Sequence, residues 1–300
     1  MSARQDWLDA RKAGIGGSDV AGILGLSKWK TPYSVWLDKT GQAADTEDNE
    51  AMKWGRLLEA PIRQEYAERT GRVVLMPDEM LRHPRHDFML ANLDGMTDDG
   101  RVVEIKTARA ATGWGEAGSD QVPQDYMFQV QHYMAVTGFK VADIAVLIGG
   151  SDFRLYEVPA DAELQDMMID AEADFWRRVQ ENDPPEPVSY ADALARWGRA
   201  SRADRAMADA DALAAIDQLR AIKAKMLALE RDEEQARAVI MRTMGECDTL
   251  VASDGRPLAT WKAQAGANRF DATTFKVQYP ELHAKFIKQG EPTRRFLLKA

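Results

Sequence analysis

The chain has 300 residues and is 45% hydrophobic, which is enough for one large domain or two ordinary ones with a substantial core. Its one cysteine, Cys247, excludes a disulfide framework and a thiolate zinc site, and it fits a reducing compartment. No apolar run approaches about 18 residues, and the N-terminus lacks the charged-then-apolar layout of a signal peptide. We therefore expect a cytoplasmic protein that does not enter a membrane.

The formal net charge of −9 does not exclude a polyanionic partner, because the charge is unevenly distributed. Residues 161–186 carry nine acids against two arginines, whereas residues 262–300 carry eight Lys or Arg against three acids. Residues 1–40 carry six Lys or Arg against four acids. Acidity is concentrated in the middle of the chain, and both ends could face phosphate.

A glycine-rich segment, Arg11-Lys-Ala-Gly-Ile-Gly-Gly-Ser-Asp19, is the first element of chemical interest. Glycines let the backbone approach a ligand closely, and Ser18 is predicted to cap a helix that begins there. Exposed N–H groups at that helix start, with Arg11 nearby, would suit a phosphate. An ordinary glycine turn capped by serine explains the same residues, so both interpretations stay open.

Two further helices are predicted before the first strands. Thr31 and Pro32 supply the N-cap and the first position of one helix, which ends before Gly41. The next covers about residues 49–69 and presents an apolar face on which Glu59 lies at the margin. A carboxylate beside a buried face indicates a partner, although most such glutamates extend to water.

The segment Val102-Val-Glu-Ile-Lys-Thr107 reads as a β-branched strand with charged residues two positions apart. Side chains alternate across a strand, so Glu104 and Lys106 should point to one face while Val103 and Ile105 point to the other. An exposed hairpin with a surface ion pair is the alternative interpretation of these residues.

Asp94 comes shortly before this strand and is followed by a polar turn at residues 98–100. That turn folds the preceding run, residues 88–96, back against the strand and can bring Asp94 beside Glu104. Two carboxylates held together repel each other unless a cation lies between them, and oxygen ligands suit Mg²⁺ or Mn²⁺. With Lys106 placed to activate a water or stabilise a phosphate, this is the Asp…Glu-x-Lys pattern of metal-dependent nucleases.

A fourth helix is predicted after a loop that contains Trp114. Gln129 lies three positions after Tyr126 and four before Tyr133, so the three side chains share one face. Glutamine commonly orients water or ligands, and a helix-surface amide is the ordinary alternative.

The chain then divides into blocks at Asp183-Pro-Pro-Glu-Pro187, a cluster of helix breakers that is the best linker candidate. We predict a first domain over residues 1–187 and a C-terminal module over residues 188–300. In the module, apolar residues recur at intervals of three, four and seven residues over about residues 202–244. This spacing predicts one long amphipathic helix of roughly 60 Å, or two helices joined at a bend. Short strands around residues 249–252 and 257–262 and a basic tail follow. Such a helix should pack on its own core, on a sister subunit or on another protein.

Six of these motifs, in this order and at these spacings, resemble one family. The first 180 residues or so are similar to the YqaJ-type phage recombination nucleases, relatives of lambda exonuclease with the PD-(D/E)xK motif. The resemblance is carried by Arg11 with Gly14-Ile15-Gly16-Gly17-Ser18-Asp19, Thr31-Pro32 with Trp36, Gly55 with Glu59, Asp94-Gly95, Glu104-Ile105-Lys106, and Gln129-Val130-Gln131.

The resemblance implies a fold and a metal site. The fold would be α+β (mixed α/β), a restriction-endonuclease-like core with a mixed central sheet flanked by helices. Asp94 and Glu104 would be ligands of Mg²⁺, with Mn²⁺ as a substitute, and the Ile105 carbonyl would complete the inner shell. Lys106 would position and activate the attacking water. The C-terminal module would lie outside the shared core.

The resemblance also assigns roles to four residues around that site. Glu59 would reach the metal through a water molecule, and Gln129 would help to hold the nucleophile or Glu59. Arg11 and Ser18 would contact the phosphate at a DNA end.

The implied reaction is hydrolysis of duplex DNA from 5′ ends, which leaves a 3′ single strand for an annealing protein. The relatives' ring-shaped trimers imply a homo-oligomer, and a phage gene would place the protein in the cytoplasm of a bacterial host. A structure-specific or sequence-specific endonuclease could use the same site. A non-catalytic DNA-end binder should lack one of the acidic ligands, and a purely structural protein would not explain the first block.

Overall fold

A computed structural model describes residues 11–43, 49–199, 204–267, 269–288, 290 and 293–299. The chain divides into two compact units, Met1–Arg196 and Trp197–Ala300. The segment predicted as a linker, Asp183–Pro187, lies within the first unit. There Pro185 is buried and its carbonyl accepts a hydrogen bond from Arg196 at 3.3 Å.

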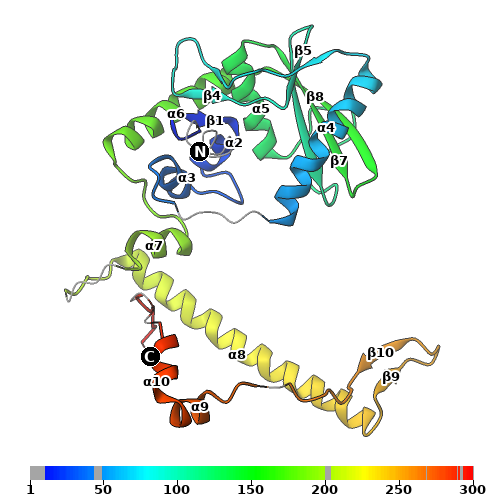
Figure 1. The fold of residues 1–300 in the computed structure, drawn as a ribbon, viewed down its shortest axis with the longest axis vertical. Helices are drawn as coiled ribbons and strands as arrows, with labels where there is room; N and C mark the ends of the chain where they lie inside the picture. The colour runs from blue at the N-terminus through cyan, green and yellow to red at the C-terminus, as the bar shows by residue number, and fades with distance from the viewer. Residues whose placement is uncertain are drawn as a thin grey trace. The chain divides into compact units, whose positions relative to one another are not determined.

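A five-stranded sheet forms the centre of the first unit (Figure 1). Strands β6 and β7 are parallel, and the other neighbouring pairs are antiparallel, so the sheet is mixed, as predicted. In spatial order the strands are β2 (Val74–Leu75), β5 (Gly95–Thr97), β6 (Arg101–Ala108), β7 (Val141–Ile148) and β8 (Asp152–Pro159).

Helices cover both faces of this sheet, and the alternation of residues along β6 sets which side chain meets which helix. Helix α4 (Glu50–Thr70) packs against Val103 and Ile105. Helix α5 (Gln124–Thr137) packs against the opposite face, where Val102 joins its core cluster. Because side chains alternate along a strand, Glu104 and Lys106 lie on the α5 side.

A smaller sheet joins the N-terminal segment to the core, in the order β1 (Ile15–Gly16), β4 (Met89–Ala91) and β3 (Leu81–Arg82). The run 88–96 is therefore not one strand, because β4 and β5 belong to different sheets. Three helices surround a second core cluster beside β1: α2 (Gly17–Ile23), α3 (Pro32–Lys39) and α6 (Ala162–Glu181).

Local capping residues set the first residue of two helices as predicted, but not that of a third. Thr31 caps α3 by accepting a hydrogen bond from the Ser34 N–H at 3.0 Å, and Asn49 caps α4, so both predicted starts are confirmed. The prediction for Ser18 is wrong: Gly16 is the N-cap of α2, and Ser18 lies inside the helix.

Most of α7 (Tyr190–Trp197) belongs to the first unit. Asp192 is buried there and accepts hydrogen bonds from the Thr31 hydroxyl at 2.8 Å and from the Ser189 N–H at 3.1 Å. The predicted domain boundary at residue 187 thus lies before a helix that is tied to α3.

The second unit is dominated by helix α8 (Ala210–Met244). Its start was predicted near residue 202, but residues 204–209 are not helical, and the Asp209 side chain caps the helix by accepting from the Ala212 N–H at 2.8 Å. The expected strands pair antiparallel as β9 (Thr249–Val251) and β10 (Pro257–Thr260), and two short helices follow, α9 (Ala272–Gln278) and α10 (Pro280–Phe286). None of the helices in the described ranges combines the length and apolar character needed to cross a bilayer.

Candidate active site

Asp94 stands at the point where β5 stops pairing with β6. The last pair of this hairpin is Gly95 with Val103, so the next stretch of β6 has no β5 neighbour on that edge. Asp94 fills the gap: its Oδ2 accepts a hydrogen bond from the Ile105 N–H at 2.9 Å. Gly95 is required here, because a Cβ at this position would lie 2.7 Å from Val74 Cγ1.

The Ile105 carbonyl faces the same edge. In an extended strand the N–H and the C=O of one residue point to the same side. Since the N–H of Ile105 reaches Asp94, its carbonyl oxygen also points toward the Asp94 side rather than toward β7. The three predicted ligands, Asp94, Glu104 and the Ile105 carbonyl, are therefore brought to one region by the hairpin.

Glu104 is buried, with 2% of its surface exposed. Its Oε1 accepts hydrogen bonds from Lys106 Nζ and from Gln129 Nε2, the latter at 2.7 Å. Its Oε2 is buried and has no hydrogen-bond partner among the described residues. A buried carboxylate oxygen without a donor is costly, and such an atom is suited to bind a cation.

Lys106 and Gln129 complete a small polar network on the α5 face. Lys106 Nζ donates to Gln129 Oε1 at 3.2 Å and lies 4.7 Å from the centre of the Tyr126 ring. Gln129 Nε2 also donates to the Tyr133 hydroxyl at 3.0 Å. The shared helix face predicted for Tyr126, Gln129 and Tyr133 is confirmed, and Gln129 holds both charged residues of the strand.

Glu59 approaches from α4. It forms an ion pair with Arg63, 3.3 Å between Oε1 and Nη2, and Arg63 donates to the Asp94 carbonyl at 2.7 Å. Burial raises the pKa of Glu59, and the nearby Asp94 carboxylate raises it further. Glu59 is therefore an electrostatic neighbour of Asp94, connected to it through Arg63.

Burial raises the pKa of each of the acids in this region. Burial, together with Asp94 and Glu59, raises the pKa of Glu104 to about 8 against the lowering effect of Lys106. Burial also raises the pKa of Asp94, despite Lys106, the Ile105 N–H and Arg63. For Lys106, burial alone would lower the pKa, but Glu104 and Asp94 outweigh it and the pKa rises. The carboxylates outnumber the cations that face them.

These residues fit a hard divalent cation. Oxygen donors and no thiolate or imidazole are the ligand set that Mg²⁺ and Mn²⁺ prefer, and the unpartnered Oε2 of Glu104 supplies a free ligand atom. Among the described residues no group of three or more His, Cys, Asp or Glu side chains is arranged for a metal. A divalent cation here would therefore be bound by two carboxylates and a backbone carbonyl. Lys106 donates a hydrogen bond to one oxygen of Glu104.

The glycine-rich segment forms a second charged cluster, around Asp19. Asp19 is fully buried, and its carboxylate lies 2.6 Å from Lys30 Nζ and 2.6 Å from Lys39 Nζ. Arg11 lies 3.6 Å from the same carboxylate and donates to the Ser18 hydroxyl at 3.3 Å. Burial would raise the pKa of Asp19, but the three cations lower it well below its usual range.

Close packing places this segment against α5. A Cβ on Gly17 would lie 2.7 Å from Tyr133 Cε1 and 2.9 Å from the Gln129 carbonyl oxygen, so only glycine fits. The predicted phosphate residues Arg11 and Ser18 are thus brought together, and their segment touches the helix turn that carries Gln129. Ser18 is exposed, whereas Arg11 is partly buried.

With this geometry established, similarity to known proteins identifies the family. The family described as the YqaJ-like viral recombinase domain matches residues 6–140. "Uncharacterized protein YqaJ" of Bacillus subtilis (strain 168) is 35% identical over 306 residues, covering 99% of this chain and 94% of the relative. The chain belongs to the YqaJ-like viral recombinase family.

Two solved structures resemble this YqaJ-family protein more weakly. An alkaline exonuclease (LHK-Exo) from Laribacter hongkongensis is 20% identical, covers 60% of this chain and 94% of its own, and has a TM-score of 0.49. A putative exonuclease from Eubacterium rectale is 13% identical, covers 69% and 96%, and has a TM-score of 0.44. The sequence similarity to YqaJ, and not these structural likenesses, assigns the family.

The extent of the family match separates the two halves of the YqaJ-family protein. Residues 6–140 include every predicted site residue, from Arg11 to Gln129. The second unit lies outside that match, as expected, yet the alignment with the B. subtilis relative covers 99% of the chain. The sequence of the second unit therefore also aligns with that relative.

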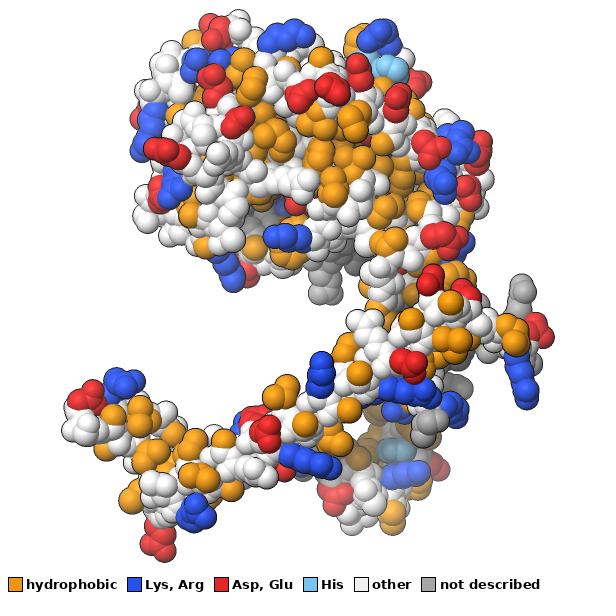
Figure 2. Space-filling view, turned by 180° about the vertical axis from the view of Figure 1, so that it is seen from behind, with side chains coloured by type: hydrophobic (Ala, Val, Ile, Leu, Met, Phe, Trp, Pro, Cys, Tyr) orange, Lys and Arg blue, Asp and Glu red, His pale blue; other side chains and the backbone are white. Residues whose placement is uncertain are grey.

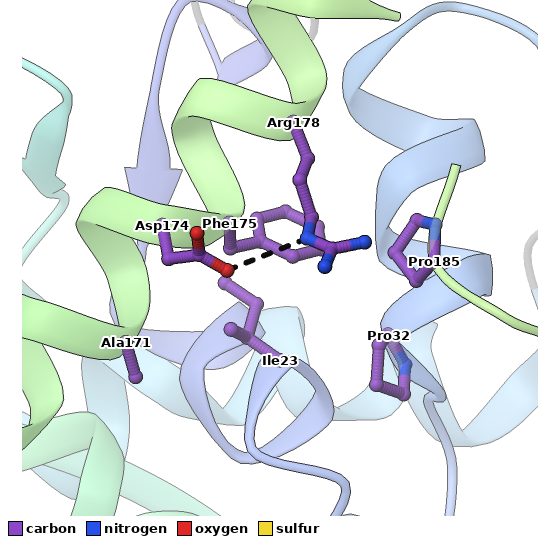
Figure 3. Close-up of a pocket in the computed structure, with 7 residues that line it drawn as sticks. All are labelled: Ile23, Pro32, Ala171, Asp174, Phe175, Arg178 and Pro185. Atoms are coloured by element: carbon purple, nitrogen blue, oxygen red, sulfur yellow. Dashed lines mark hydrogen bonds and ion pairs between the residues drawn. The ribbon is translucent and has the colours of Figure 1, made fainter. Parts of the chain in front are cut away.

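A surface pocket elsewhere in the first unit of the YqaJ-family protein contains none of these residues. Figure 3 shows it between α6 and the start of α3, with the Asp174–Arg178 ion pair, 3.3 Å, at its wall. It is lined by Ile23, Pro32, Ala171, Asp174, Phe175, Arg178 and Pro185. Asp174 and Arg178 also pair with Arg177 and Asp183, so the charges at this pocket are balanced and we assign it no role.

Sequence reasoning missed three residues that shape the site of this YqaJ-family protein. Asp19 was seen as part of a motif but given no role, although it is the centre of the Arg11 cluster. Tyr133 and Arg63 hold Gln129 and Asp94. The i,i+4 spacings of Glu59 with Arg63 and of Gln129 with Tyr133 were the available signals.

Proposed function

We propose that this protein is a metal-dependent deoxyribonuclease of phage-type recombination, an exonuclease that hydrolyses linear duplex DNA from 5′ ends. Membership of a viral recombinase family makes DNA the natural substrate. The observation that carries the proposal is the buried Glu104 beside Asp94, with one oxygen held by Lys106 and the other unpartnered.

The chemistry divides between a cation and the chain's own residues. A Mg²⁺ or Mn²⁺ ion at Asp94, Glu104 and the Ile105 carbonyl would neutralise the charge that develops on the scissile phosphate. Lys106 orients the attacking water and stabilises negative charge beside the phosphate. Gln129 fixes both Glu104 and Lys106 through its amide, and Tyr133 fixes the amide.

Glu59 has a supporting role in this proposal. It lies within electrostatic range of Asp94 and is anchored by Arg63, which also grips the Asp94 carbonyl. A carboxylate with a raised pKa beside two ligands can accept a hydrogen bond from a water bound in the site. Glu59 would thereby fix a solvent position without contacting the cation directly.

Arg11 and Ser18 are proposed to hold the phosphate at the DNA end. Their side chains already meet at 3.3 Å, and Ser18 is exposed. The segment that carries them touches α5 at Gln129, so an end phosphate bound there would lie on the helix side of the site. Asp19 keeps the three cations in place and limits their net attraction for other anions.

The proposal extends to products and partners. Degradation from a 5′ end leaves a 3′ single strand, which a single-strand annealing protein would take up, and a homo-oligomer such as a ring-shaped trimer would keep the enzyme on its substrate. Cytoplasmic action in a bacterial host follows from a phage-type role.

Digestion of labelled DNA tests the reaction. Linear duplex labelled at either the 5′ or the 3′ end is compared with closed circular duplex, with Mg²⁺ or with EDTA. We expect loss of the linear form only, early release of the 5′ label, and no reaction in EDTA. Cleavage of the closed circle would instead establish an endonuclease with the same site.

A matched pair of variants ties the activity to the site. Asp94→Ala should abolish cleavage while leaving DNA binding measurable. Asp98→Ala removes an exposed carboxylate from the same hairpin and should cleave like the unmodified protein. Equal activity of both variants would refute the assignment of Asp94.

A further inference from the structure

Helix α8 carries an apolar seam with a seven-residue repeat that is exposed from Ile222 to Ile240 and half-buried at Leu219. The seam positions alternate by three and four residues, and the large ones stay accessible: Ile222 is 45% exposed, Met226 56% and Leu229 67%. In the full repeat the seam runs through Leu219, Ile222, Met226, Leu229, Glu233, Ala236 and Ile240. A repeat of 3.5 residues is the pattern by which one helix packs along another.

Near its middle, charged residues flank this seam in two blocks of opposite sign, and farther along the flanking Arg237 pairs with Glu233. Lys223 and Lys225 border its first half, and Glu230 and Asp232 border its second half. No ion pair joins any of these four to another described residue, and all four are exposed. Figure 2 shows hydrophobic and charged side chains alternating along this helix. The pattern changes sign between Leu227 and Ala228, near the middle of the repeat.

We propose that α8 pairs with α8 of a second copy of this chain, antiparallel, about a two-fold axis between Leu227 and Ala228. In that register Met226 packs beside Leu229 of the second copy, and Leu219 beside its Ala236. Lys223 then faces Glu230 of the second copy on one flank, and Lys225 faces its Asp232 on the other. The two-fold axis repeats both contacts, so four ion pairs border the seam.

The antiparallel direction follows from two residues of the seam. In a parallel pair Glu233 would face its own copy across the seam, which places two carboxylates together in an apolar layer. Antiparallel pairing sets Glu233 beside Ile222, and its intrahelical ion pair with Arg237, 2.6 Å, remains available. The small Ala236 then lies opposite the larger Leu219 instead of a second alanine, so the layer is filled.

The extent of the pairing is sufficient for a stable contact. The matched layers run from residue 212 to residue 243, about 48 Å at 1.5 Å per residue. This stretch is longer than the roughly 12–15 residues below which an isolated helix is only marginally stable in water. The pairing uses only the second unit, so it holds whether or not the first unit is a nuclease or forms a ring.

Charge-reversal variants of the full chain test the pairing by sedimentation velocity over a concentration series. The unmodified chain should show an assembly that is halved in mass in Lys223→Glu/Lys225→Glu and in Glu230→Lys/Asp232→Lys, with association weakened about tenfold or more. Mixing the two variants should restore the mass, because each supplies the charges that the other lacks. Arg231→Glu/Arg242→Glu makes the same change in charge on the outward side of the helix and should leave the mass unchanged.

A single variant tests the direction. Lys223→Glu should weaken association, because Lys223 faces Glu230 only in the antiparallel pair. In a parallel pair Lys223 would face the uncharged Gln218 of the second copy, so unchanged association of Lys223→Glu would overturn the antiparallel direction. Equal masses for the unmodified chain and both charge-reversed doubles, with unchanged helicity by circular dichroism, would overturn the self-pairing. That result would leave another protein or the chain's own tail as the occupant of the seam.

Discussion

Two buried carboxylates of the first unit, Asp19 and Glu104, have opposite electrostatic surroundings. Asp19 meets two lysines at 2.6 Å each, with Arg11 at 3.6 Å, and its pKa is lowered. Glu104 meets one lysine and faces Asp94, and burial raises its pKa to about 8. Both are almost fully inaccessible to water.

The difference separates an acid that is paired within the fold from one that we propose to bind a cation. A buried charge is tolerated when it is paired and fully hydrogen-bonded, which describes Asp19. Glu104 keeps a like-charged neighbour and an oxygen that no described residue partners, an arrangement that costs stability unless a cation is bound. Excess negative charge around Glu104 therefore supports the proposed cation site, whereas burial alone does not distinguish the two acids.

The strongest test of this comparison is removal of Asp94, the proposed metal ligand beside Glu104. Asp94→Ala should lower the rate of DNA hydrolysis by on the order of 10³-fold or more, because the cation and the transition-state charge it balances are both lost. The free energy of unfolding should change much less, because loss of the hydrogen bond from the Ile105 N–H is offset by relief of the repulsion between Asp94 and Glu104. Single-turnover cleavage and urea unfolding of the same preparation measure both quantities.

The opposite result is expected for Asp19→Asn. Removing the carboxylate leaves Lys39, whose side chain is completely buried, without its charged partner, although its hydrogen bond to the Arg11 carbonyl at 3.0 Å remains. Breaking a buried ion pair from one side typically costs about 3–5 kcal/mol of unfolding free energy. Urea unfolding at pH 7 provides the measurement, and Asp38→Asn next to Lys39 is the control. A loss below about 1 kcal/mol would mean that Asp19 is not the centre of its cluster.

Lys106→Ala should reduce turnover by about 10²-fold and leave cation binding intact. The lysine lies on the strand face of Glu104 and is not itself a ligand. Calorimetric titration with Mn²⁺ alongside kcat separates the two effects, and Lys140→Ala is the control for loss of one positive charge. If Mn²⁺ binding is lost together with turnover, Lys106 instead maintains the shape of the site.

The protonation of Glu104 predicts a pH dependence of stability in EDTA. Its folded-state pKa, about 8, exceeds the ordinary value of 4.5 for glutamate, so the folded protein binds the proton more tightly than the unfolded chain. This stabilising contribution is complete below about pH 4.5 and is lost as the pH rises through about 8. Glu104→Gln should flatten that part of the curve of unfolding free energy against pH. An unchanged slope in the variant would assign the pH dependence to another group.

The smallest expected effect concerns Arg11. Arg11→Ala should weaken DNA binding equally for all sequences and reduce the salt dependence by about one phosphate contact. Binding isotherms at several salt concentrations, on two unrelated duplexes, measure this. A change in sequence preference would place Arg11 at a base edge and remove it from the phosphate role.

The sequence by itself determined the features that depend on neighbours within about one turn or one strand pair. Glu104 and Lys106 share a face because strand side chains alternate, and Thr31 and Asn49 start helices because their oxygens accept nearby N–H groups. The hairpin of the second unit and the repeat of α8 were equally visible in the sequence.

The tertiary structure alone decided which charges are balanced. Lys30 and Lys39 reach Asp19 from a loop and from α3, and Gln129 reaches Glu104 from a helix that follows the strand by many residues. It also divided residues 88–96 between two sheets and made Gly16, not Ser18, the helix cap. These outcomes depend on packing between segments far apart in the chain, where the energy of a contact is set by burial and by the other groups present rather than by spacing in the sequence.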